Sequence, residues 1–425
     1  GQEKTATAGE DGAWSVRLDP LKANDKPAEM RISDGTQKVS FTDVLVGEVW
    51  LCSGQSNMEK PIGVQRGQKP IENAEEEIQK ANHPLIRLLP VPKAKNVATS
   101  AITWSVCTPQ SIDQLHFSAT AYFFGRSLQD QLHVPIGLIQ SSWGGTRIEP
   151  WTTPAGYQGV PELKQLDGEI QARQPTTRNA SLWRYGDLYH NMIEPMVPYA
   201  IRGVIWYQGE SNVMTHDRSA YFQKMQALIG GWRLVWHEGD FPFYFVELAP
   251  YTYSHHPNEH LQTDELPLVW EAQEKAMSIS HTGMAATSDL VSNTNDIHPT
   301  RKREVGERLA LWALKYDYGR SDIVCCGPTF KSVDFKDGEA VVHFDNVADG
   351  LVSRDGKPLS DFTIAGADGK FVQGTARIDG DTVIVTSDQV KSPTAVRFGW
   401  NEVAMPNLSN KSGLPALPFR NDATH

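Results

Sequence analysis

Short apolar runs alternate with amphipathic, helix-like patterns from about residue 46 to residue 320, and this alternation constrains the fold more than any other feature. Strands that alternate with helices are typical of a parallel sheet with helices on both faces. The clearest helix patterns cover residues 71–81, 118–131, 221–236, 266–278 and 303–316. Apolar runs lead to Ser56, Gly144 and Gln208, and two more cover 243–248 and 284–287. We therefore predict an α/β protein with a doubly wound parallel sheet.

Patterns typical of β-strands flank this central region on both sides. Before it, short strand-like stretches lie at 13–18, 29–32 and 39–41. After residue 327, strand patterns cover 331–335, 339–344, 362–365, 382–386 and 395–398, with Asp-Gly turns between several of them. The predicted parts are an N-terminal β segment at 1–45, an α/β domain at 46–320 and a C-terminal β domain at 327–425. We expect the C-terminal domain to form a small β-sandwich with the N-terminal strands.

The first apolar run of the central region ends in a turn that carries a hydroxyl group. Residues 47–53 are strand-like, and Gly54, Gln55 and Ser56 follow them. Ligands of α/β proteins bind beyond the carboxyl ends of the strands, so a serine there is presented to substrate. Residues 57–59 can open a helix, whose free N–H groups stabilise a developing oxyanion. An ordinary polar turn is the usual alternative for a Gly-x-Ser tripeptide, and this segment alone does not decide between them.

A histidine far downstream is the strongest candidate for a general base. His298 follows Asp296, precedes a proline, and stands just before an amphipathic helix pattern. Serine needs a base to take its proton at neutral pH, and imidazole has a suitable pKa. Of the thirteen histidines, only His298 combines these three features. A helix-capping loop with an incidental His-Pro pair is the alternative interpretation.

Two further predicted strands end in residues that suit an oxyanion. Gly144 and Gly145 follow the run 136–143, and glycines let backbone N–H groups approach a ligand closely. Gln208 and Asn212 follow the run 202–207, and their amide groups are hydrogen-bond donors. Either block alone is equally well explained as a tight turn. Four blocks with complementary chemistry together favour a catalytic site.

The four blocks resemble the motifs of a known family. Gly-Gln-Ser-Asn at 54–57, Trp-Gly-Gly-Thr at 143–146, Tyr-Gln-Gly-Glu-Ser-Asn at 207–212 and Asp-Ile-His-Pro at 296–299 are similar to those of the SGNH hydrolase superfamily. Within it, the chain resembles the sialate O-acetylesterase family of carbohydrate esterases. The segments 43–50 and 413–420 extend the resemblance to nearly the whole chain. It implies an SGNH esterase domain that hydrolyses an acetyl ester on a sugar, and further β-structure upstream of the N-terminal segment.

The resemblance also implies roles for individual residues. Ser56 is the expected nucleophile and His298 the expected base. The expected oxyanion hole consists of the N–H groups of Ser56 and of Gly144 or Gly145, and a side-chain amide from Gln208 or Asn212. The implied reaction is a two-step acyl transfer through an acetyl-serine.

The third member of the catalytic group is less well defined by the motifs. Enzymes of this superfamily generally carry the acid three residues before the histidine, and Asn295 occupies that position here. Asp296 is the nearest carboxylate and is our candidate, because an acid orients the imidazole and stabilises its charged form. A Ser-His dyad remains an alternative, and Asp289 and Glu210 are weaker candidates for the acid.

Residues beside these motifs are candidates for sugar binding. Gln55, Trp143, Arg147 and Glu210 lie next to the proposed catalytic groups, although each is equally well explained as a packing or scaffold residue. Arg147 would favour an acidic sugar such as sialic acid. An acetylesterase of xylan, xyloglucan or another plant-type polysaccharide would share the catalytic residues, so it is the alternative substrate class. A non-catalytic carbohydrate-binding protein on the same scaffold is the alternative of another class.

Composition excludes several classes of partner. The net charge is 40 − 51 = −11, which argues against binding to nucleic acid or to an anionic membrane surface. No apolar run reaches the roughly 18 to 20 residues of a membrane-spanning helix. The four cysteines show no zinc-site spacing, so we expect neither a metal nor another cofactor. We expect a secreted protein, periplasmic or extracellular, whose signal peptide is not part of this chain.

Overall fold

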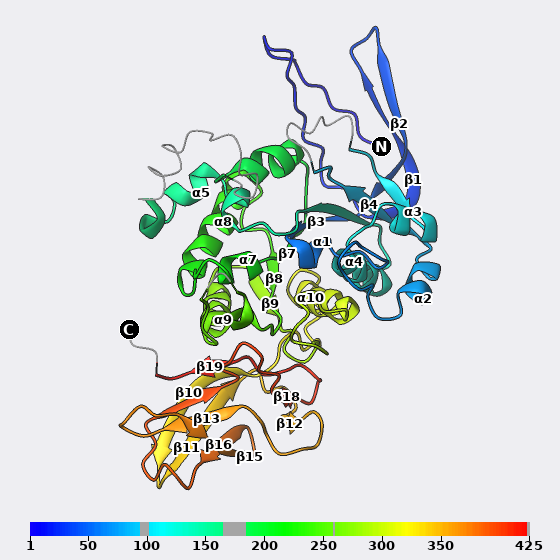
Figure 1. The fold of residues 1–425 in the computed structure, drawn as a ribbon. Helices are drawn as coiled ribbons and strands as arrows, with labels where there is room; N and C mark the ends of the chain where they lie inside the picture. Colours follow the sequence, from blue (N-terminus) through cyan, green and yellow to red (C-terminus); the bar gives the residue numbers. More distant parts are fainter. Residues whose placement is uncertain (94–101, 165–183, 258–259, 423–425) are drawn as a thin grey trace.

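A seven-stranded sheet forms the centre of the computed structural model, which describes residues 1–93, 102–164, 184–257 and 260–422 (Figure 1). The strand order across it is β5-β4-β6-β3-β7-β8-β9, and every neighbouring pair is parallel except β4 with β5. The strands are β3 (Glu48–Gly54), β4 (His83–Pro90), β5 (Ser105–Cys107), β6 (Ile136–Ser142), β7 (Gly203–Tyr207), β8 (Phe243–Val246) and β9 (Thr282–Ala285). The predicted parallel sheet is thus confirmed, with one antiparallel edge strand.

The first strand of this sheet, β3, lies near its middle. After β3 the chain crosses to β4, returns to β6 beside β3, and then continues on the other side of β3 with β7, β8 and β9. The direction of winding therefore reverses at β3, and open α/β sheets bind ligands at such a point. The strand ends are in register, because Gly54 pairs with Ser142 on one side and with Tyr207 on the other. Three of the motif-bearing turns consequently emerge side by side.

Helices of varied length connect the strands. The α-helices are α1 (Ser56–Glu59), α2 (Ala74–Gln79), α3 (Pro109–Gln114), α4 (Ala119–Leu132), α5 (Pro154–Gln158), α7 (Glu210–Val213), α8 (Ala220–Trp236), α9 (Glu265–Ala276) and α10 (Lys302–Tyr316). Shorter 3-10 or π segments are η2 (Glu149–Trp151), η3 (Pro161–Leu163), η4 (Tyr189–Ile193), η5 (Glu194–Met196) and η6 (Tyr253–His255). All five helices predicted from periodicity are present, with ends shifted by a few residues. Ser118, the predicted N-cap of α4, accepts a hydrogen bond from the N–H of Ala121 at 3.1 Å.

Helices pack on both faces of the sheet (Figure 1). On one face, Trp50 of β3 contacts Phe124 of α4, with 5.0 Å between ring centroids. Helix α10 lies against α4, and a Cβ on Gly306 would come within 2.7 Å of backbone atoms of α4. On the other face, Trp206 of β7 contacts Trp232 of α8, with 5.8 Å between ring centroids. Large aromatic side chains therefore fill both layers between sheet and helices, which fixes the sheet as a rigid support for its connecting turns.

The C-terminal region folds as antiparallel sheets with a core of its own. The strand orders are β10-β11-β16-β15, β14-β13-β17-β19 and β12-β18. The strands are β10 (Thr329–Lys336), β11 (Glu339–Asp345), β12 (Leu351–Ser353), β13 (Phe362–Ala365), β14 (Val372–Gln373), β15 (Thr375–Asp379), β16 (Thr382–Thr386), β17 (Ala395–Phe398), β18 (Leu408–Asn410) and β19 (Phe419–Arg420). Phe362, Phe398 and Phe419 are among its buried core residues. The strands predicted for this region are confirmed.

The N-terminal strands contradict one prediction about the fold. β1 (Asn24–Ser33) and β2 (Lys38–Val46) pair with each other in a separate two-stranded sheet that is almost wholly exposed. Figure 1 shows this hairpin and the C-terminal strands at opposite ends of the molecule, so the expected common β-sandwich is wrong. The reason is chain length, because only Gly47 separates β2 from β3 and the hairpin must stay beside the central sheet. Residues 13–18, predicted as a strand, form no strand.

Among the described residues, no helix is both long enough and apolar enough to cross a bilayer.

Candidate active site

Ser56 and His298 face each other at the carboxyl edge of the central sheet. The Nε2 atom of His298 lies 2.9 Å from the Oγ atom of Ser56, which is hydrogen-bonding distance. Ser56 is the first residue of α1, directly after β3, and His298 lies in the loop between β9 and α10. Both side chains are partly exposed. The structure therefore brings together the hydroxyl and the imidazole that the motifs singled out, in the arrangement of a nucleophile and its base.

The turn that carries Ser56 depends on glycine. Gly54 has φ +140°, a conformation that L side chains rarely adopt, and a Cβ there would lie 2.1 Å from the carbonyl oxygen of Tyr207. The N–H of Gln55 donates to the same carbonyl oxygen at 2.9 Å. The chain thus stays tied to the end of β7 while it turns, and Ser56 is left at the N-terminus of a short helix. Among the described residues, no acceptor is bonded to the N–H of Ser56.

Asp296 contacts the backbone of the histidine and not its ring. Its Oδ1 atom accepts a hydrogen bond from the N–H of His298 at 3.0 Å. Within the described part of the chain, no carboxylate is hydrogen-bonded to the Nδ1 atom of that ring. Asp296 therefore shapes the loop that holds the imidazole and acts on it through charge, an arrangement closer to the dyad alternative than to a hydrogen-bonded triad.

The other acid candidates have partners elsewhere. Asp289 forms two hydrogen bonds of 2.6 Å with the guanidinium of Arg308. Glu210 is buried and accepts from the side-chain amide of Asn57. The side chain of Asn295 accepts a hydrogen bond from Thr252 at 3.1 Å.

Gly144 lies directly against Ser56. A Cβ on Gly144 would lie 3.2 Å from the Cβ of Ser56, so only a glycine fits here without displacing the serine. Its N–H donates to the Oε2 atom of Glu59 at 2.6 Å, so this donor already has a partner in the structure. Gly145 follows with φ +74° and open space around it, and no acceptor is bonded to its N–H among the described residues.

Gln208 and Asn212 use their amides inside the protein. Gln208 is fully buried, and its Nε2 atom lies within 3.1 Å of acceptors on Gln55, Thr146 and Asn212. Asn212 is also fully buried, and its Nδ2 atom donates to the carboxylates of Glu149 and Asp217. This geometry gives both residues a scaffold role at the ends of β6 and β7, and it offers no free side-chain amide at Ser56 from either of them.

The four residues expected to bind sugar fall into two groups. Gln55 and Glu210 are buried, and Gln55 accepts hydrogen bonds from the N–H groups of Gly209 and Ser211 at 3.3 Å. Trp143 and Arg147 are partly exposed on the turn after β6.

The guanidinium of Arg147 lies 3.7 Å from Glu149, a loose ion pair, and 28% of its side chain is exposed. The side chain of Trp143 packs partly against the main core, and the ammonium of Lys93 lies 5.8 Å from its ring centroid. Of the two pairs, only this one offers surface to a ligand.

The electrostatic environment keeps the imidazole neutral. Burial, together with the ammonium groups of Lys302 and Lys60, lowers the pKa of His298 to about 4, against the opposing effect of Asp296 and Glu59. A neutral imidazole accepts a proton and a protonated one does not. The ring is therefore ready to act as a base over the whole range above about pH 5.

Comparison with family models extends the resemblance seen in the motifs. Residues 46–315 match the model of the family described as carbohydrate esterase, sialic acid-specific acetylesterase. The chain belongs to this family. Its members are hydrolases that act on ester bonds of acetylated carbohydrates, and the matched segment contains the whole central sheet and both Ser56 and His298.

Curated relatives of this esterase family are similar over most of the chain. The sialate O-acetylesterases of Homo sapiens and Pongo abelii are each 31% identical over 360 residues, which covers 78% of this chain and 65% of theirs. The chain thus spans somewhat less than two thirds of the length of these relatives. Among solved structures, a carbohydrate acetylesterase from Xanthomonas citri matches with a TM-score of 0.83 and 35% identity, covering 97% of this chain and 89% of that one.

Four residues of the candidate site were not singled out in the sequence. Asn57 and Lys302 form a buried hydrogen bond of 2.7 Å behind Ser56, Lys60 is buried nearby, and Glu59 binds the N–H of Gly144. The signal for Asn57 and Glu59 was their position next to the nucleophile. Nothing in the sequence distinguishes Lys60 or Lys302 from surface lysines, because their burial follows from how α1 and α10 meet.

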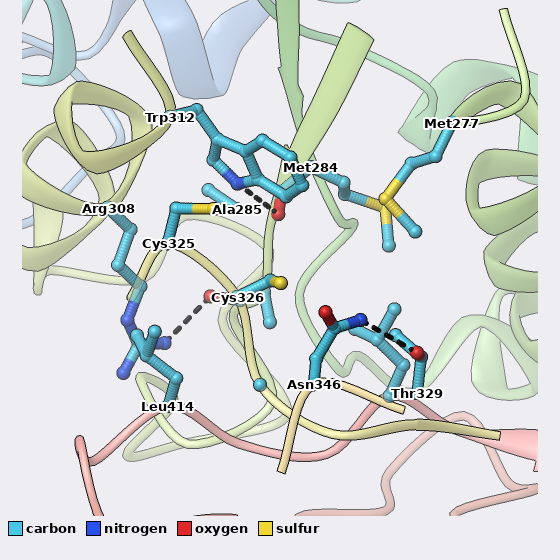
Figure 2. A pocket seen from close by; sticks show the side chains of 13 residues that line it. Met277, Met284, Ala285, Arg308, Trp312, Cys325, Cys326, Thr329, Asn346 and Leu414 are labelled. Atoms are coloured by element: carbon cyan, nitrogen blue, oxygen red, sulfur yellow. Dashed lines mark hydrogen bonds between the residues drawn. The ribbon is translucent and has the colours of Figure 1, made fainter. Parts of the chain in front are cut away.

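A cavity elsewhere in the chain lacks the serine and histidine of the Ser56 site. Figure 2 shows a space of about 40 Å³ lined by residues of α10, β9 and the start of the C-terminal strands. Cys325 and Cys326 lie there as free thiols, and Trp312 donates to the carbonyl of Met284 at 3.0 Å. No serine lines this cavity, so it is not an alternative candidate for the active site. A polar hollow of about 110 Å³ next to Asp296 is closer to that site and includes Lys69 in its wall.

Proposed function

We propose that this chain is a serine esterase that removes O-acetyl groups from sialic acid by two-step acyl transfer. The observation that carries the proposal is the 2.9 Å contact between Ser56 and His298 at the switch point of the sheet, in a member of a carbohydrate esterase family. A protein that only bound sugars would have no use for a hydroxyl paired with a neutral imidazole.

The first step forms an acetyl-enzyme. The neutral imidazole of His298 takes the proton from Ser56 Oγ as this oxygen attacks the acetyl carbonyl carbon. The imidazolium then gives that proton to the sugar oxygen, the ester bond breaks, and the deacetylated sugar leaves. Both groups are partly exposed, which allows a bulky alcohol to depart.

The developing oxyanion needs donors close to Ser56. We assign this role to the N–H of Ser56 at the start of α1 and to the N–H of Gly145, next to Gly144, since neither has an acceptor among the described residues. The N–H of Gly144 is hydrogen-bonded to Glu59. Gly144 contributes because it has no side chain and so leaves room for the acyl group. This assignment replaces the side-chain amides of Gln208 and Asn212, whose donors have internal partners.

The second step releases acetate. His298 takes a proton from a water molecule, the water oxygen attacks the acetyl carbon, and Ser56 leaves with the proton returned by the imidazolium. The turnover therefore needs a base that is neutral at the start of both steps, and the low pKa of His298 provides one down to mildly acidic pH.

An acidic sugar is the proposed substrate because of Arg147. Its guanidinium is partly exposed on the turn that carries Gly144 and Gly145, and its link to Glu149 is long at 3.7 Å. An arginine in this position has free donors for a carboxylate. The sialate O-acetylesterases among the relatives agree with this choice.

The test is acetate release by the purified chain from 9-O-acetylated sialic acid, acetylated xylan and acetylated xyloglucan, with Ser56→Ala as the matched control. Release from the sialic acid alone, lost in Ser56→Ala, is the expected result. Release from a plant polysaccharide alone would overturn the substrate. Release from none of them, nor from a small aryl acetate, would overturn the activity.

A further inference from the structure

A single buried amide connects the nucleophile turn with the base loop. Asn57 follows Ser56 in the chain, and its Nδ2 atom donates to the carbonyl oxygen of Ile297 at 2.9 Å. Ile297 immediately precedes His298. The residues next to the two reacting groups are therefore joined by a direct hydrogen bond across 240 positions of sequence.

Two charged side chains complete the hydrogen bonds of this amide. Glu210 of α7 accepts from the Nδ2 atom of Asn57, and Lys302 of α10 donates to its Oδ1 atom at 2.7 Å. Asn57, Glu210 and Lys302 are 1%, 2% and 0% exposed, respectively. The ammonium of Lys302 also lies 5.0 Å from the ring centroid of Tyr207 at the end of β7. We call Asn57, Glu210 and Lys302 the Asn57 clamp.

The side-chain amide of Asn57 is saturated, and this makes its geometry specific. An amide has two N–H donors and one acceptor oxygen, and here both donors and the oxygen have partners. Buried polar networks of this kind cost stability when one member is lost, since the remaining groups stay desolvated without a partner. Replacing Asn57 therefore removes the bond between the turn at Ser56 and the loop at His298, and replacing Glu210 or Lys302 leaves the amide that makes this bond less firmly held.

We infer that the Asn57 clamp is the positioning device of the reaction: it sets the approach of Ser56 Oγ to His298 Nε2, and its ammonium group keeps the imidazole in the basic form. This inference rests on the proposed function, in which these two atoms exchange a proton. None of the three clamp residues touches the reacting atoms in the structure, so each acts through Ser56 or His298.

The charges around His298 support the second part of the inference, which concerns the basic form of the imidazole. The groups that act electrostatically on His298 are Lys302 from α10, Lys60 and Glu59 from the segment of α1, and Asp296 from its own loop. Burial lowers the pKa of Lys302 to about 7, so its ammonium is charged throughout the acidic range in which His298 titrates. The two lysines oppose protonation of the imidazole and the two carboxylates favour it.

The first test replaces Lys302 with methionine, which keeps the length of the side chain and removes its charge and donor. The base must be neutral, so activity is present above the pKa of His298 and is lost as the pH falls through it. Loss of a nearby positive charge raises that pKa, and we expect the acidic limb of kcat/KM to move up by about one pH unit. We also expect kcat on the plateau to fall on the order of 10²-fold, with KM little changed, because the reacting atoms are misplaced.

Two lysine variants serve as controls. Lys60→Met removes a second buried charge but no bond to Asn57, since Lys60 donates to Gln68 and to the carbonyl of Lys69. We expect it to move the acidic limb in the same direction and to reduce the plateau less. Lys315→Met removes a charge about 20 Å further along α10 and leaves activity and pH profile unchanged. A folded Lys302→Met variant with the wild-type limb and plateau would overturn the inference.

A second comparison covers the case in which Lys302→Met does not fold. Glu210→Gln keeps an acceptor for Asn57, whereas Glu210→Leu removes it. We expect Glu210→Leu to lose about tenfold more in kcat than Glu210→Gln, the value of one hydrogen bond. Equal kcat values in the two folded variants would contradict the positioning role.

Titration of the His298 ring by NMR separates this inference from the proposed function. The pKa is read from the ring carbon signal, assigned with His298→Ala, and needs no substrate. If no acetyl ester is hydrolysed and the pKa still rises in Lys302→Met, the proposed function fails and the effect of the clamp on the imidazole stands. If the wild type is active and the pKa is the same in both, the inference fails alone.

Discussion

Ser56 and Asn57 are neighbours in one short helix, yet they belong to two different environments. On the open side, Ser56 faces His298 and lies against Gly144, and exposed Gly145 and partly exposed Arg147 follow on the same turn. On the closed side, Asn57 faces a region in which buried amides and carboxylates bond to each other, to lysine ammonium groups and to backbone groups. The contrast separates two groups of motif residues within one site. We expect residues of the open side to contact substrate, and residues of the closed side to hold them in position.

Residues of one motif can therefore have different roles. Gln55, Gln208, Glu210 and Asn212 belong to the same sequence blocks as the catalytic candidates, but all four are buried. Variants on the open side should therefore impair activity and spare stability, whereas variants on the closed side should do the reverse or impair both. The following experiments test that separation.

The largest effect is expected at the nucleophile itself. Ser56→Ala should lower kcat by roughly three to six orders of magnitude, because no other hydroxyl replaces the attacking oxygen. The thermal unfolding midpoint should stay close to wild type, since a partly exposed hydroxyl is lost whose one hydrogen bond within the described residues is to His298. Acetate release and a melting curve check both statements. Substantial residual turnover by a folded variant would remove Ser56 from its role.

A closed-side variant should show the opposite profile. Asn212→Leu removes the acceptor of the Ile148 N–H and one donor to each of the carboxylates of Glu149 and Asp217, which keep only the ammonium of Lys224 from this network. We expect it to lower the free energy of unfolding by about 3 kcal/mol. Denaturant unfolding measures this loss. Wild-type stability with strongly reduced kcat would instead place Asn212 on the open side, as an oxyanion donor.

Asp296 lies at the border between the two sides, and a smaller effect is expected there. Asp296→Asn keeps an oxygen that accepts from the N–H of His298, so kcat should fall about tenfold, far less than in His298→Ala. The carboxylate raises the pKa of His298, so its loss should lower that pKa and move the acidic limb to lower pH. Rate–pH profiles of both variants decide the question. Equal losses would mean that the carboxylate contacts the ring in the working enzyme.

The smallest effect concerns substrate choice on the open side. Arg147→Met should raise KM for acetylated sialic acid by about tenfold and leave KM for an uncharged acetyl ester unchanged, since only the former offers a carboxylate. The two Michaelis constants, measured with the same preparation, provide the comparison. A similar rise for both substrates would assign Arg147 to the structure of the turn.

The sequence was sufficient to predict the main sheet and to select Ser56 and His298, which the structure brings within hydrogen-bonding distance. Parallel strands are buried on both faces, so their apolar runs were easy to recognise. Ser56 follows such a strand, and His298 stands shortly before a helix with a clear amphipathic pattern. The partner of the hairpin β1–β2 was not predictable in the same way, because a β pattern indicates a strand and not the sheet that it joins. The prediction of a shared β-sandwich failed for that reason.

The burial of individual polar side chains could not be predicted from the sequence either. In the sequence, a glutamine that donates to an oxyanion looks the same as one with a scaffold role. Only the structure shows that the amide of Gln208 is bonded to Tyr221, Gln55 and Asn212. Lys302 is similar, since its helix pattern permits either a surface or a buried position. Such assignments depend on several segments far apart in the chain.

The burial of Lys60 and Lys302 has a consequence for how the protein responds to ionic strength. The chain carries a net charge of −11, whereas the two ammonium groups near His298 are 1% and 0% exposed. Dissolved ions screen charges that face solvent and hardly reach buried ones. Added salt should therefore weaken the general repulsion of anionic sugars and raise their association rate, while the acidic limb set by His298 stays where it is. A salt series would thus separate the long-range field of the whole protein from the local field inside its active site.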